Sequence, residues 1–78
     1  TGKVRMTIKE LEKEVKKKSE SGELRMKLGE SYLLQGNYDN AIDTLEQSVD
    51  IIEKHEKDNK LLSKSWNFLG QAKYEKGE

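Results

Sequence analysis

Apolar residues recur at intervals of three and four along most of the chain, which is the period of an amphipathic helix. The pattern predicts helices over residues 7–19, 23–35, 38–57 and 60–76. No segment alternates apolar and polar residues as a strand does, so the predicted fold class is all-α. The four predicted inward stripes are Ile8, Leu11 and Val15; Leu24, Leu28 and Tyr32; Ala41, Ile42, Leu45, Val49 and Ile52; and Leu62, Trp66, Leu69 and Ala72.

Capping residues mark the ends of these segments. Thr7 and Glu10 have the spacing of a capping box, in which each side chain accepts from the other residue's backbone N–H. Gly36 follows the second segment, where a glycine can take the left-handed conformation that closes a helix. Asp58 precedes the fourth segment and can cap it. The end of the third segment, residues 53–57, is wholly polar and is expected to project beyond the core.

Two of the patterns occur twice. The stripe of the first segment returns in the third at an offset of 34 residues, and a Leu-Gly pair in the second returns in the fourth at an offset of 41. Gly29 and Gly70 lie within helices, where glycine costs ~1 kcal/mol relative to alanine. That cost is tolerable where another helix must approach closely, and we expect Ala41 to lie opposite Gly29. The repeated residues are Ile8, Leu11 and Val15 with Ile42, Leu45 and Val49, and Leu28, Gly29 and Gly36 with Leu69, Gly70 and Gly77.

These residues resemble the tetratricopeptide repeat, a helix–turn–helix unit of 34 residues with the pattern W-x2-L-G-x2-Y followed by A-x3-F and P. The resemblance implies antiparallel helix hairpins stacked as a short solenoid of about four helices. In the second segment the chain departs from the pattern at Arg25, which stands in place of the tryptophan. In the fourth segment Lys73 stands in place of the tyrosine, and the chain has no proline. The matching runs are Leu28-Gly29-x2-Tyr32, Ala41-x3-Leu45, Gly36-Asn37-Tyr38 and Trp66-x2-Leu69-Gly70.

The domain organisation follows from the resemblance. Residues 1–78 are expected to form one such domain or a fragment of a longer one: a half repeat over 7–19, a full repeat over 22–58, and the first helix of a further repeat over 60–78. We exclude Thr1 and Gly2 as a cloning scar. The long third segment is similar to the repeats of about 40 residues in cell-polarity adaptors, kinesin light chains and bacterial peptide-sensing regulators.

Composition excludes several classes of function. The chain has no cysteine, which rules out disulfides, thiolate metal sites and a cysteine nucleophile. Fifteen basic residues balance fifteen acidic ones, so the basic footprint of a nucleic-acid-binding protein is absent. No apolar run is long enough to span a membrane. We expect no nucleic-acid, membrane or small-molecule partner and no cofactor. The lack of a signal-peptide pattern favours an intracellular, cytoplasmic location.

Candidate chemical sites are few. His55 is the only histidine, and a surface position is a better interpretation than a metal site. The lysine run at residues 16–18 is compatible with a nuclear signal or a phosphate contact, but acidic residues flank it. The glycines form no phosphate-binding loop, and no serine has a histidine placed to activate it. The sequence therefore predicts no metal site and no enzyme.

The resemblance implies a protein–protein interaction module, which binds a peptide or a partner helix through a concave face, as part of a scaffold or adaptor. A merely solvated polar face is the alternative for the same residues. A second hypothesis is an assembly element that forms a homo-oligomer through its unpaired last helix, and a third is the sensory part of a peptide-responsive regulator. The predicted binding residues are Met26, Glu30, Leu33, Lys64, Asn67, Gln71 and Tyr74, and those predicted for self-association are Trp66, Phe68 and Leu69.

Overall fold

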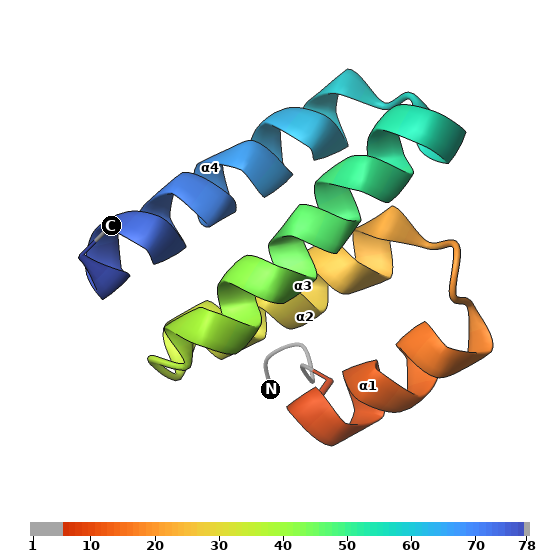
Figure 1. The fold of residues 1–78 in the computed structure, drawn as a ribbon. Coiled ribbons are helices and arrows are strands. Elements are labelled where there is room, and N and C mark those ends of the chain that lie inside the picture. Colours follow the sequence, from red (N-terminus) through yellow and green to blue (C-terminus); the bar gives the residue numbers. More distant parts are fainter. Residues whose placement is uncertain (1–5, 78) are drawn as a thin grey trace, which may run out of the picture.

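The computed structural model describes residues 6–77, which form four α-helices and confirm the all-α prediction. Helix α2 and helix α3 make an antiparallel hairpin, and α4 returns along α3 in the direction of α2 (Figure 1). A π-helical segment, Ile52–Glu56, continues α3 and accounts for the length of the predicted third helix. The helices are α1, Ile8–Lys17; α2, Gly22–Leu34; α3, Tyr38–Ile51; and α4, Asn59–Lys76.

Local hydrogen bonds set the helix ends that the sequence predicted. The Thr7 backbone N–H donates to Glu10 Oε1 at 2.8 Å, and the Glu10 N–H donates to Thr7 Oγ1 at 3.1 Å. This capping box lowers the pKa of the Glu10 carboxyl, chiefly through the bond from the Thr7 backbone. At the end of α2, Gly36 adopts φ +79°, and the Asn37 N–H donates to Tyr32 O at 2.9 Å, as in a Schellman motif. Asp58 Oδ1 accepts from two N–H groups at the start of α4.

The π-helical segment ends without a glycine. Lys57 takes the left-handed conformation, with φ 50°, and its N–H donates to Ile52 O at 2.6 Å. Ile52 is fully buried, whereas the polar residues 53–57 are exposed, as expected for a turn that projects beyond the core. The apolar stripe of α3 therefore ends at Ile52, and residues 53–57 extend the helix beyond the core without adding apolar contacts.

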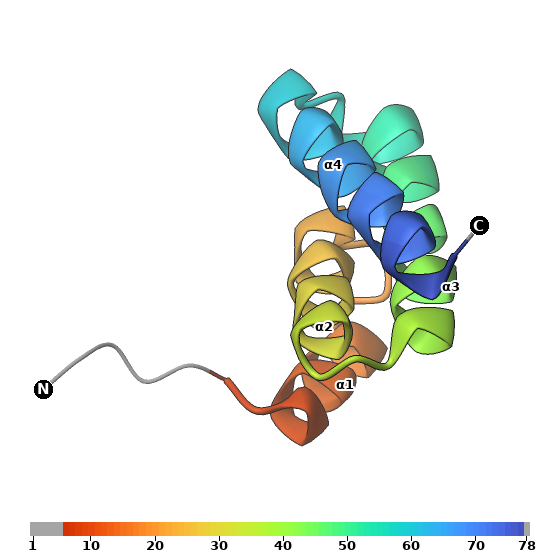
Figure 2. The same cartoon turned by 90° about the vertical axis from the view of Figure 1, so that its left-hand side faces the viewer.

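Helix α2 lies at the centre of the fold, with α1, α3 and α4 packed around it (Figure 2). Its closest approach is to α3: a Cβ added to Gly29 would lie 2.5 Å from Leu45 Cγ. The expected close approach at this glycine is present, but Leu45 covers it, not Ala41. The larger side chain fits because Gly29 has none. The central core consists of Met26, Leu33, Ala41, Leu45, Leu69 and Ala72.

A second close contact joins the start of α2 to the end of α3. A Cβ on Gly22 would lie 2.5 Å from both Ile52 Cγ1 and Glu56 Oε1. Gly22 is thus the buried first residue of α2, one residue before the predicted start of this helix. Ser48 Oγ donates to the carbonyl of Gly22 at 2.8 Å and lies 3.0 Å from Ser65 Oγ of α4. This buried hydroxyl pair links α2, α3 and α4.

Polar side chains connect α2 to its other neighbours. Arg25, at the position where the repeat pattern has tryptophan, donates through Nε to Gln47 of α3 and through Nη1 to the carbonyl of Ser19. Tyr32 donates its hydroxyl to Glu12 of α1 at 2.5 Å. Burial, together with this carboxylate, raises the pKa of Tyr32 to about 12. These hydrogen bonds thus join α2 to α3 and to α1.

The inward face of α4 differs from the predicted one. Leu69 and Ala72 are buried as expected, and Ser65 is fully buried beside them. Trp66 is 51% exposed, so the predicted stripe was wrong at this position, whereas Leu62 is partly buried. Small residues face α3 because the two helices lie close together, and the larger apolar side chains are displaced to one side.

Candidate protein-interaction surface

One side of α2 remains open to solvent between its neighbours. Its exposed residues are Glu23, Lys27 and Leu34, and Glu30 is partly exposed beside them. Glu23 and Lys27 form an ion pair at 4.0 Å, one helical turn apart. Leu34 is 67% exposed, an unusual position for a leucine next to a buried one. This stripe is mixed in character, with both charges and one apolar residue.

A matching stripe runs along α4. Lys64, Asn67 and Gln71 are all exposed at helical spacing, as the sequence predicted. Within residues 6–77, no hydrogen bond or ion pair engages these three side chains. By the 41-residue offset, Glu30 of α2 and Gln71 of α4 occupy equivalent positions. The two stripes therefore present unpaired carboxylate, amide and ammonium groups.

The space between the exposed stripe of α2 and that of α4, here called the seam, is filled by the protein's own side chains. Met26 is 6% exposed and Leu33 7%, and both belong to the core. They were predicted to contact a partner, but α4 packs over α2 and covers them. The prediction treated α2 as having a single buried stripe, whereas three helices pack against it. Phe68, half-buried, packs against the same core.

The residues predicted for self-association are also divided between buried and exposed positions. Leu69 is 3% exposed within the core, and Phe68 is half-buried against it, so neither can supply the main contact with another copy. Trp66 remains exposed, and Tyr74, predicted for peptide binding, is 80% exposed on the same side of α4. Gly70 lies between them, and an added Cβ there would meet nothing within 4 Å.

The hairpin of α2 and α3 packs closely at Gly29, where Leu45 covers the glycine. The Leu-Gly pattern of α2 occurs again in α4. The sequence profile of the tetratricopeptide repeat family matches residues 20–78, about three quarters of the chain. The chain belongs to this family. Comparison with curated proteins finds no match, and comparison with solved structures finds none either.

Tetratricopeptide repeats mediate protein–protein interaction, which is therefore the general function of this chain. The family is typically a non-enzymatic interaction module. Within residues 6–77, no group of three or more histidine, cysteine or acidic side chains is placed to hold a metal ion, and His55 is exposed. None of the described helices is both long and apolar enough to cross a membrane.

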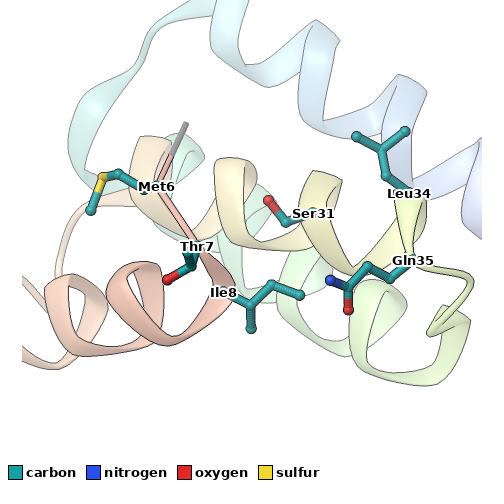
Figure 3. A pocket seen from close by; sticks show the side chains of 6 residues that line it. All are labelled: Met6, Thr7, Ile8, Ser31, Leu34 and Gln35. Atoms are coloured by element: carbon teal, nitrogen blue, oxygen red, sulfur yellow. The ribbon is translucent and has the colours of Figure 1, made fainter. Parts of the chain in front are cut away.

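A shallow hollow at the C-terminal end of α2 was not predicted. It has a volume of about 260 Å³ and lies between the start of α1 and the end of α2 (Figure 3). Its apolar lining residues are Met6, which is 41% exposed, Ile8 and Leu34. A sequence signal existed, because Met6 directly precedes a capping box, where an apolar residue commonly packs back onto the helix. The lining residues are Met6, Thr7, Ile8, Ser31, Leu34 and Gln35.

Proposed function

We propose that this tetratricopeptide repeat binds an extended protein segment across the exposed stripes of α2 and α4. The observation that carries the proposal is the row of unpaired polar side chains on α4. Asn67 and Gln71 are one turn apart and exposed, and each amide offers both a donor and an acceptor. Such groups can pair with the backbone N–H and C=O of an extended segment, whose own groups are otherwise unsatisfied.

Charge and apolar contacts would orient the segment. Glu30 on α2 and Lys64 on α4 are of opposite sign and lie on opposite sides of the seam, so each favours a complementary charge in the ligand. At the end of α2, exposed Leu34 and the hollow beside Met6 can accept one apolar side chain. The preferred ligand would then carry a bulky apolar residue at one end and polar residues along the rest.

The test is selection followed by mapping. A displayed library of random peptides would be screened against the protein, and selected peptides would be measured by fluorescence anisotropy. Replacing both amides, Asn67→Ala with Gln71→Ala, removes hydrogen bonds worth ~1 kcal/mol each, so affinity should fall about tenfold or more. Helicity should stay unchanged, because both side chains are exposed.

A double variant on the outer face of α1, Lys9→Ala with Lys13→Ala, is the matched control, since both of those residues are also exposed. Its affinity should equal that of the native chain. Amide chemical-shift changes on adding the peptide should concentrate on α2 and α4. Selected peptides that bind the amide variant with unchanged affinity, or shift changes confined to α1, would refute the proposed surface.

A further inference from the structure

A second surface on α4 is distinct from the proposed peptide site in its lack of charge. Six exposed residues form a continuous stripe along the whole helix, at intervals of three and four, and none of them is charged. In a chain with 38% charged residues, most exposed helix faces carry several charges. The residues of this uncharged stripe are Asn59, Ser63, Trp66, Gly70, Tyr74 and Gly77.

The stripe is built around Gly70. Trp66 precedes it by four residues and Tyr74 follows it by four, so each aromatic ring lies ~6 Å from Gly70 along the helix axis. On the helical projection they flank Gly70 on either side. The surroundings of Gly70 are open, in contrast to Gly29, whose equivalent position is covered by Leu45. Another helix can therefore approach the backbone at Gly70 as closely as α3 approaches α2.

We propose that the occupant is a second copy of this chain, whose α4 packs antiparallel to the first about a twofold axis at Gly70. In that register Gly70 meets Gly70, and Trp66 of one copy lies level with Tyr74 of the other. A twofold interface must be self-complementary, and this stripe meets the condition because its two aromatics are equally spaced from the glycine. Because the stripe carries no charged residue, its residues place no like charges opposite one another across the interface.

The charges along one edge of the stripe are engaged within the chain. At the edge of the stripe, Lys73 lies 3.9 Å from Glu46 of α3, and Lys76 pairs with Asp39 at 2.5 Å. These ion pairs hold the ammonium groups toward α3 and away from an incoming helix. The outer face of α1, in contrast, is covered by exposed lysines and glutamates.

The area involved indicates a weak dimer. Fully buried tyrosine and tryptophan side chains remove ~150–250 Å² each from solvent. With Trp66 half exposed and Tyr74 four-fifths exposed, the four aromatics of a dimer would bury about 500 Å². Adding their neighbours gives an interface of about 1,000 Å², near the lower limit for specific complexes. An interface of this size is typical of weak, transient association, so we expect the dimer to form only at high protein concentration.

Sedimentation velocity over about 10 µM to 1 mM tests the association by mass action. The mass should rise from 9.0 kDa toward twice that value. The emission of Trp66, the only tryptophan, should shift to the blue in parallel. Gly70→Lys should abolish both changes without loss of helicity, because the position is open in the monomer. Gln71→Lys adds the same charge one residue away, outside the stripe, and should dimerise like the native chain.

Single cysteines test the register, because the native chain has none. Gly70→Cys places two thiols at the twofold axis, within disulfide range, and should form a covalent dimer on mild oxidation. In the antiparallel register Ser63→Cys places them ~21 Å apart, too far to link. A chain that stays monomeric at 1 mM would overturn the proposal. So would a Gly70→Lys variant that dimerises normally, or a Ser63→Cys variant that links as fast as Gly70→Cys.

Discussion

Replacing each of two equivalent glycines by alanine should change the stability of this protein in opposite directions. Gly29 and Gly70 occupy the same position in successive copies of the Leu-Gly pattern, and both lie within helices. Alanine is more favourable than glycine in a helix by ~1 kcal/mol, and this gain applies to both sites. The difference between them comes entirely from what the new methyl group meets.

At Gly29 the methyl group would lie 2.5 Å from Leu45 Cγ and 2.7 Å from Cδ2. Leu45 is fully buried, so its side chain cannot relieve the contact by moving into solvent. Overpacking of this kind costs ~1–3 kcal/mol. After the helix gain, Gly29→Ala should lower the free energy of unfolding by ~1 kcal/mol. At Gly70 nothing lies within 4 Å, so Gly70→Ala should raise it by ~0.5–1 kcal/mol.

Urea and thermal unfolding, followed by circular dichroism at a concentration near 5 µM, would measure both variants where the chain is monomeric. A difference of ~2 kcal/mol corresponds to ~8–16 °C between their melting temperatures. Equal gains in both variants would refute the reasoning, because they would mean that Leu45 does not cover Gly29 in solution. An equal loss in both would mean that Gly70 is covered in the monomer.

Three further predictions concern the contacts that hold the helices together. Ser48→Ala should cost ~1–3 kcal/mol, because it leaves the Ser65 hydroxyl without its buried partner; Ser65→Ala should cost less in the same urea titration, since Ser48 keeps its bond to Gly22. Gly22→Ala should lower the unfolding midpoint through contact with fully buried Ile52, and an unchanged midpoint would argue against that contact. In a spectrophotometric titration near 295 nm, Tyr32→Phe should remove a component with a midpoint of about 12. Because that pKa is raised on folding, the stability linked to it is present below pH 10 and lost as the pH rises toward 12; an unchanged titration curve would contradict the assignment.

The helix ends could be predicted from the sequence because their causes are local. A capping box needs only two residues three apart, and the closing turn of α2 needs only one glycine that can take a positive φ. Both features appear in the structure where the sequence placed them, at Thr7 with Glu10 and at Gly36. Such signals depend on neighbouring residues and are insensitive to how the helices pack.

The exposed surface was harder to predict because it depends on how many neighbours each helix has. One apolar stripe was assigned to α2, but three helices surround it, so Met26 and Leu33 became core residues. In α4 the buried positions include Ser65 and Ala72, which give little hydrophobic signal, while the more apolar Trp66 lies outside. The periodicity of a single helix identifies its apolar positions but cannot say which of them another helix will cover.

The two ends of the fold differ in a way that bears on assembly. Stacked repeats expose an apolar face at each end unless a polar helix caps it. Helix α1 supplies such a cap at one end, with Leu11 buried against α2 and an outer face of exposed charges. Helix α4 does not, since it exposes Trp66, Tyr74 and an open Gly70 along an uncharged stripe. A twofold contact between two α4 helices closes on itself, because each copy uses the same surface, so it permits pairing but not open-ended growth.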